Sequence, residues 1–183
     1  MSSIPGRDKT ALLVIDVQVG VVAHGYKRDA VVGRIADLVE RARAAGTPVV
    51  WVQHSEEEMP IGCDDWQLVP ELRPLEGEPV VHKNYRSSFE STNLEAVLAE
   101  RNIGKLIVCG AQSNNCVRST GYAALDRGYD VLLVEDAHTT DDGNWDGSLI
   151  PASMVIDEQN RTMMWNDLPG RSSRIAAAAD IQF

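Results

Sequence analysis

The stretch Ala11-Leu-Leu-Val-Ile15, which ends at Asp16, decides the fold of this chain. Five consecutive apolar residues predict a short strand that is buried on both faces, as in a parallel sheet, with Asp16 at its carboxyl end. Apolar residues then recur at helical spacing from Asp29 to Ala45, where Asp29 can cap the start of a helix and Gly46 can end it. A strand followed by an amphipathic helix is the unit from which α/β sheets are built.

Segments of both kinds alternate along the rest of the chain. The predicted strands are Val49 to Val52, Val80-Val81, Lys105 to Cys109, Asp130 to Val134 and an edge strand from Ser173 to Ala178. The predicted helices are Thr92 to Arg101, with a capping box of Thr92 and Glu95, Cys116 to Arg127, and residues 149–163, with Pro151 in the first turn. The fold class is therefore α/β, a single domain over residues 1–183 with a doubly wound, mainly parallel six-stranded sheet and helices on both faces.

Composition excludes several classes of function. The chain has 183 residues, 17 basic and 27 acidic, and a formal net charge of −10, which disfavours nucleic-acid binding because phosphate contacts need clustered Lys and Arg. Its apolar runs are far shorter than the roughly 20 residues of a membrane span, so we expect no membrane partner. Three cysteines without a Cys-x-x-Cys pair, and no apolar leader, favour a reduced, cytoplasmic location.

Two predicted loops carry the excess of acid. Residues 55–78 hold eight acidic residues and one arginine, and residues 135–146 hold five acidic residues and no lysine or arginine. Both segments follow predicted strands at their carboxyl ends, which is where open parallel sheets bind ligands. We therefore expect an acidic rim that favours neutral or amine-bearing substrates, whereas the alternative is two solvated loops, with a structural role for Asp136 at its strand end.

Three residues near strand ends could carry chemistry. Cys116 lies in a polar turn that opens a helix, where free N–H groups lower a thiol pKa and can hold an oxyanion. Lys83 follows the third strand and could stabilise a thiolate, and Asp16 could act as a general base. The alternatives are a buried core cysteine, a solvated surface lysine and an aspartate that caps a loop or pairs with Lys83. Cys109, inside an apolar run, is expected to be buried and inert.

Other catalytic motifs are absent from the sequence. No GxGxxG follows the first strand, and neither a GxxxxGK[ST] phosphate loop nor a GxSxG nucleophile turn occurs. The four histidines, His24, His54, His82 and His138, have no metal-ligand spacing, so no metal site and no cofactor are expected. We expect His54 and His82 to form hydrogen bonds at strand ends.

The candidate residues lie in motifs that resemble the isochorismatase-like cysteine hydrolases over nearly the whole chain. The matching segments are Leu12-Leu-Val-Ile-Asp-Val-Gln18, Lys83-Asn-Tyr-Arg-Ser-Ser-Phe89 and Cys109-Gly-Ala-Gln-Ser-Asn-Asn-Cys-Val-Arg-Ser-Thr120. The resemblance implies a catalytic triad of Asp16, Lys83 and Cys116. It also implies a cis peptide between Ala111 and Gln112, with the N–H groups of Gln112 and Cys116 forming an oxyanion hole.

The resemblance also narrows the chemistry. Nicotinamidases of this superfamily bind a metal after the second strand, but here Gln53 and Ser55 stand at the expected ligand positions, so a metal site is not expected. Members dedicated to isochorismate commonly lack the cysteine that this chain keeps. The chain therefore looks closest to the metal-free amidase branch, near N-carbamoylsarcosine amidase and streptothricin hydrolase. The predicted function is cysteine-dependent cleavage of a C–N bond in a small amide, ureide or lactam through a thioester. The alternatives are isochorismatase-type ether hydrolysis and a non-catalytic or redox-responsive oligomer.

The pocket walls and the assembly are further expectations. Gln18, Trp66, Tyr85, Phe89 and Asn115 are predicted to contact the small-molecule substrate. Trp66 could instead anchor its own loop or meet a partner subunit, and Trp145 is equally open. The family resemblance implies a homodimer or homotetramer.

Overall fold

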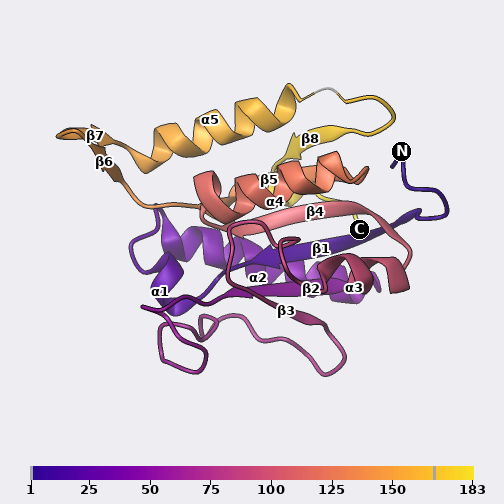
Figure 1. Cartoon of the computed structure of the whole chain (residues 1–183), viewed down its shortest axis with the longest axis horizontal. Coiled ribbons are helices and arrows are strands. Elements are labelled where there is room, and N and C mark those ends of the chain that lie inside the picture. The colour runs from indigo at the N-terminus through magenta and orange to yellow at the C-terminus, as the bar shows by residue number, and fades with distance from the viewer. Residues whose placement is uncertain (1, 167) are drawn as a thin grey trace.

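Strand β1 (Lys9–Ile15) lies inside a six-stranded parallel sheet. The computed structural model describes residues 2–166 and 168–183, so positions 1 and 167 of the predicted domain lie outside the described residues. The strand order is β3-β2-β1-β4-β5-β8, where the other strands are β2 (Val49–His54), β3 (Val80–Lys83), β4 (Ile103–Ala111), β5 (Asp130–Thr139) and β8 (Ser173–Ala176). The predicted α/β class, the six strands and the edge position of β8 are confirmed (Figure 1).

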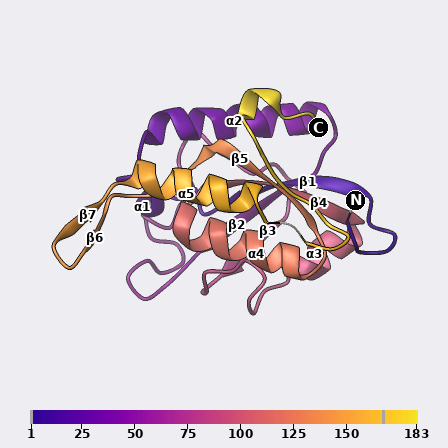
Figure 2. The same ribbon diagram turned by 90° about the horizontal axis from the view of Figure 1, so that it is seen from above.

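Helices cover both faces of this sheet, as Figure 2 shows from above. Leu12 and Val14 of β1 pack in a cluster with helix α2 (Arg28–Ala44) and the short turn η2 (Ala178–Asp180). Leu13 and Ile15 pack on the opposite face with α3 (Leu94–Glu100), α4 (Arg118–Asp126) and α5 (Ala152–Met164). Because alternate residues of β1 face different helical layers, the strand must be apolar throughout, which explains the opening run.

The segment predicted as the second acidic loop is largely structured. Residues 135–139 extend β5, and strands β6 (Gly143–Trp145) and β7 (Ser148–Ile150) form an antiparallel hairpin that projects from the body of the molecule (Figure 1). Asp146 and Gly147 connect these strands with φ angles of 49° and 77°. An Asp-Gly pair with two positive φ angles is the usual two-residue hairpin turn, a signal that the sequence analysis missed.

Two predicted helix starts are wrong in detail. Thr92 accepts a hydrogen bond from the Leu94 N–H, but the Glu95 carboxylate contacts Arg7 and the Tyr129 hydroxyl instead of closing a capping box. Tertiary partners therefore outcompete the local cap. Pro151 precedes α5 as its N-cap instead of lying in the first turn. No described helix has the length and apolar character needed to cross a bilayer.

Candidate active site

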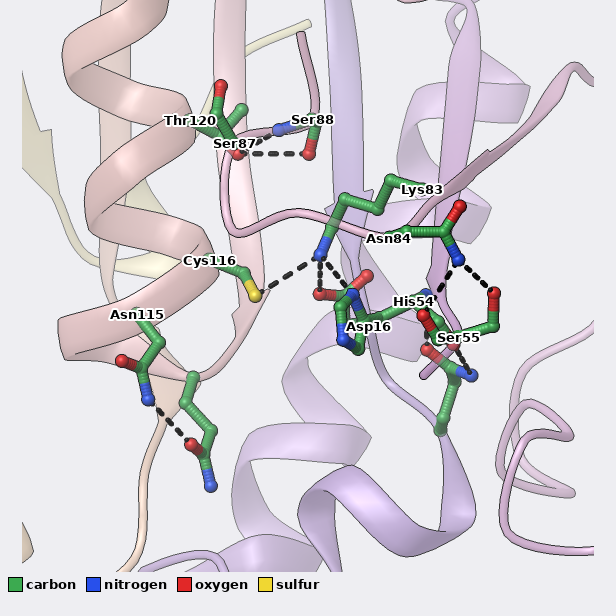
Figure 3. A network of polar contacts seen from close by, with 12 residues as sticks. Asp16, His54, Ser55, Lys83, Asn84, Ser87, Ser88, Asn115, Cys116 and Thr120 are labelled. Atoms are coloured by element: carbon green, nitrogen blue, oxygen red, sulfur yellow. Dashed lines mark hydrogen bonds and ion pairs between the residues drawn. The ribbon is translucent and has the colours of Figure 1, made fainter. Parts of the chain in front are cut away.

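Asp16, Lys83 and Cys116 meet at the carboxyl end of the sheet (Figure 3). The Lys83 Nζ lies 2.7 Å from an Asp16 carboxylate oxygen and donates a hydrogen bond to the Cys116 Sγ at 3.2 Å. The side chains of Asp16 and Lys83 are fully buried, and Cys116 is half-buried. A buried charge requires a counter-charge, so Lys83 is neither a solvated surface lysine nor an isolated one.

The backbone around Asp16 and Gly110 brings the strand ends together. Asp16 follows β1 with φ 49°, in the left-handed region, which turns the chain out of the strand. Gly110 of β4 has φ 122°, and a Cβ at that position would lie 2.0 Å from the Ile15 carbonyl oxygen. Only glycine permits this approach of β4 to the end of β1. Cys116 then follows in a π-helical turn, η1 (Ser113–Val117), that continues directly into α4.

The electrostatics of the site differ from the sequence expectation. Burial raises the pKa of Asp16, and the Lys83 ammonium opposes part of that rise. Burial first, and then the charge of Asp16, raise the pKa of Cys116 to about 12, whereas a helix N-terminus was expected to lower it. Cys116 lies inside a π-helical turn and is packed on the sheet, so desolvation dominates. In the resting site Cys116 is therefore a thiol, and the neighbouring Asp16 carboxylate is a stronger base than an exposed aspartate. Cys109 is buried and burial raises its pKa, as predicted for an inert thiol.

The turn before Cys116 is fixed by its own hydrogen bonds. The peptide bond between Ala111 and Gln112 is cis. The Gln112 side chain accepts a hydrogen bond from Asn115 Nδ2 at 2.9 Å and donates one to Asp141 at 3.1 Å. The Gln112 carbonyl accepts hydrogen bonds from the N–H groups of Asn115 and Val117. These contacts hold the backbone of Gln112 and Cys116 at the pocket wall.

A second polar chain lies behind this turn, in the core. His138 is 1% exposed, its Nδ1 lies 2.7 Å from the Ser113 hydroxyl and its Nε2 lies 2.9 Å from Asn160 Oδ1. Asn160 Nδ2 donates to the Glu135 carbonyl, which leaves Asn160 Oδ1 to accept the proton on His138 Nε2. His138 Nδ1 then accepts from Ser113, and burial lowers the pKa of His138. These contacts were not predicted from the sequence, because β5 was expected to end at Val134, whereas it continues to Thr139.

A cavity of about 610 Å³ opens above Cys116. Tyr85 and Asn115, which were expected to contact the substrate, line it, and so does Arg86, for which the sequence suggested no role. Its other lining residues include Glu56, Met59 and Asp65 from the loop between β2 and β3. This loop therefore supplies acidic groups to the cavity.

The second acidic segment meets the cavity only indirectly. Asp141 contacts Gln112, whereas Asp136 binds Arg34 and the Ala178 N–H in the structural role expected for it. The expectation that both acidic segments form the rim is therefore wrong for the second segment, which mainly extends β5 and forms the hairpin.

Three of the predicted contact residues do not line this cavity. Gln18 is fully buried and brackets the backbone of His54, accepting from its N–H at 2.7 Å and donating to its carbonyl at 2.9 Å. Phe89 packs in the core against Tyr129. Trp66 stacks on His82 with ring centroids 5.5 Å apart, which anchors its own loop. Each of these side chains instead contacts groups within the protein.

Trp145 also lies away from the cavity. It is 77% exposed on the β6–β7 hairpin and is not among the residues that line the cavity. The homodimer or homotetramer stays a prediction.

The expected metal-ligand positions are occupied by side chains that bind protein groups. Gln53 Nε2 donates to the Trp66 carbonyl, and the Ser55 hydroxyl accepts from Asn84 Nδ2. Within residues 2–166 and 168–183, no group of three or more His, Cys, Asp or Glu side chains could hold a metal ion. His54, between Gln53 and Ser55, instead points to Lys83 and lines the cavity. From its sequence position, His54 was expected only to form a hydrogen bond at a strand end.

Comparisons with known proteins agree with this architecture. Residues 10–149 match the family model described as "Isochorismatase domain". Streptothricin hydrolase of Streptomyces noursei is 38% identical over 143 residues, which cover 74% of this chain. The matched region spans only 56% of that relative's length.

Two solved structures extend the likeness to the whole fold. An isochorismatase from Pseudomonas putida KT2440 superposes with a TM-score of 0.86 at 31% identity, covering 94% of this chain and 90% of that one. N-carbamoylsarcosine amidase from Thermoplasma acidophilum superposes with a TM-score of 0.75 at 26% identity, covering 96% of this chain and 100% of that one.

Proposed function

The chain belongs to the isochorismatase family, and we propose that it is a cysteine-dependent hydrolase that cleaves a C–N bond in a small amide, ureide or lactam. The names of two similar proteins, streptothricin hydrolase and N-carbamoylsarcosine amidase, support C–N hydrolysis. The observation that carries the proposal is the buried Lys83 ammonium, held between the Asp16 carboxylate and the Cys116 sulfur beneath an open cavity.

The reaction begins with attack of the Cys116 sulfur on the substrate carbonyl while the thiol proton passes to Asp16. A thiol with a raised pKa cannot supply a standing thiolate, so the transfer must accompany attack on the substrate carbonyl. Burial raises the pKa of Asp16 and makes this carboxylate a stronger base. The Lys83 ammonium stabilises negative charge on the sulfur as the S–C bond forms.

Collapse of the tetrahedral intermediate breaks the C–N bond. Asp16 returns its proton to the departing nitrogen, which leaves as an amine or ammonia, and Cys116 is left as a thioester. Asp16 then takes a proton from water as that water attacks the thioester carbonyl, and the regenerated thiolate takes the proton back. The backbone N–H groups of Gln112 and Cys116, at the cavity wall, would hold the carbonyl oxygen in both steps.

Site-directed substitution of Cys116 tests this function. A panel of amides, ureides and lactams, with isochorismate as a separate arm, is assayed with wild type, Cys116→Ala and a matched control. The control is Cys63→Ser, because Cys63 is a free cysteine in the loop between β2 and β3. We expect turnover of at least one C–N substrate by wild type and Cys63→Ser, loss of about 10³-fold or more in Cys116→Ala, and a covalent acyl adduct by mass spectrometry.

Two results would contradict the proposal. Full activity of Cys116→Ala would exclude the thioester route. Hydrolysis of isochorismate alone would assign ether chemistry to the same site.

A further inference from the structure

The Lys83 ammonium has a third partner that the proposed reaction leaves unexplained. Besides Asp16 and Cys116, the Nδ1 atom of His54 lies 3.2 Å from Lys83 Nζ (Figure 3). An ammonium group carries three N–H donors and no acceptor. The Cys116 sulfur and His54 Nδ1 lie at hydrogen-bond distance from Nζ, and the Asp16 carboxylate forms an ion pair with it at 2.7 Å, so three groups surround the ammonium of a side chain that is fully buried.

The contact fixes the state of His54. Because Lys83 can only donate, His54 Nδ1 must be unprotonated, and the imidazole must carry its proton on Nε2 as the neutral tautomer. The nearest charged partner of Nε2 is the Glu56 carboxylate at 3.6 Å, which favours a proton on that nitrogen.

The fold holds His54 in place through its backbone and its strand. His54 is the last residue of β2 and pairs in register with Lys83, the last residue of β3, so the two side chains lie on neighbouring strands at one level. Gln18, which is itself fully buried, binds both the N–H and the carbonyl of His54. Gln18 Nε2 also donates to the Trp66 carbonyl at 2.7 Å, so the glutamine that binds the His54 backbone is itself fixed and restricts the position of the imidazole.

We propose that His54 is a positioning residue that acts through Lys83: it takes the third N–H of the ammonium and thereby aims the other two at Asp16 and Cys116. A lysine side chain has several rotatable bonds, and two acceptors leave its third N–H without a partner in a buried site. This inference deepens the proposed function, because a correctly aimed ammonium is what stabilises the sulfur anion.

The main test needs no substrate. Alkylation of Cys116 by iodoacetamide at pH 8 is followed by mass spectrometry in a Cys63→Ser background, with Cys109 protected by burial. His54→Leu removes the acceptor, whereas His54→Asn offers an amide oxygen near the position of Nδ1. His82→Asn is the matched control, since His82 precedes Lys83 on β3 but stacks on Trp66.

We expect His54→Leu to slow alkylation about tenfold, with His54→Asn and His82→Asn close to the background rate. On a hydrolysed amide, the loss should fall on kcat with little change in KM. Equal alkylation rates in all variants would overturn the proposal.

A measurement on the wild-type protein covers the case in which His54→Leu does not fold. An imidazole ¹⁵N–¹H correlation spectrum, assigned with His54→Asn, should show His54 protonated on Nε2 alone at neutral pH. Protonation on Nδ1 would overturn the proposal. If alkylation responds as expected but no panel compound is hydrolysed, the positioning role stands and the proposed function fails.

Discussion

Two histidines lie on opposite sides of the turn that carries Cys116, and their surroundings differ. His54 lines the cavity and contacts an ammonium that is shared with Asp16 and Cys116. His138 is sealed in the core, and its two hydrogen-bond partners are neutral, the Ser113 hydroxyl and the Asn160 amide. The polar groups around His54 include charges and reach the cavity, whereas the hydrogen-bonded groups around His138 are neutral and buried.

The difference indicates a division of labour. Charges buried beside an open cavity stabilise changes of charge during a reaction, and they are costly to maintain in the folded protein. A neutral, fully satisfied chain costs little and fixes one backbone arrangement. The charged side should therefore govern rate, and the neutral side should mainly govern stability.

The largest effect is expected from Lys83→Met. Activity should fall about 10³-fold or more, because the sulfur anion loses its counter-charge. Stability measured by urea unfolding should fall by about 3–5 kcal/mol, because Asp16 stays buried without a partner. Adding Asp16→Asn to Lys83→Met should recover much of the stability and none of the activity. Lys105→Met is the control, because Lys105 lies near the start of β4, at the end of that strand opposite to the site.

A smaller effect that falls mainly on stability is expected from Ser113→Ala. This change leaves His138 Nδ1 without a donor, which should cost about 1–3 kcal/mol in urea unfolding. The loss in kcat should be far smaller than that of Lys83→Met. Ser148→Ala, on the exposed hairpin, serves as the control. A loss of activity as great as that of Lys83→Met would contradict the division between the two chains.

The pH dependence of stability should also separate the two sides. Burial lowers the pKa of His138 in the folded state, so the unfolded chain binds a proton first as the pH falls. Stability from neutral His138 is therefore fully present above the ordinary histidine value of about 6.5 and is lost below it. The melting temperature of wild type should fall through this range more steeply than that of His138→Gln. Parallel curves would disprove the assignment.

The smallest effect is expected at the cavity rim. Glu56 is exposed, so Glu56→Gln should reduce the preference for a cationic over an anionic amide only about two- to fivefold in kcat/KM, and less at high salt. Asp37→Asn, on α2, is the control. If wild type shows no charge preference at low salt, the acidic loop has no part in selecting substrates.

Most of the fold followed from local patterns. The alternation of apolar runs and helical periods predicted the six strands and the helical layers on both faces of the sheet. A strand that is buried on both faces needs consecutive apolar residues, as in β1, so a local pattern reveals it. The β6–β7 hairpin was not predicted, although Asp146-Gly147 is a typical sequence for its two-residue turn. The predicted capping box at Thr92 failed because Glu95 finds Arg7 and Tyr129, which are distant in sequence.

The sequence by itself placed Asp16, Lys83 and Cys116 near strand ends, and parallel strands bring such ends to one edge. Only the tertiary structure decided what these residues are chemically. Burial reversed the expected pKa shift of Cys116, and strand register set His54 beside Lys83. Desolvation and contact between neighbouring strands depend on residues far apart in the chain, so no local pattern encodes them.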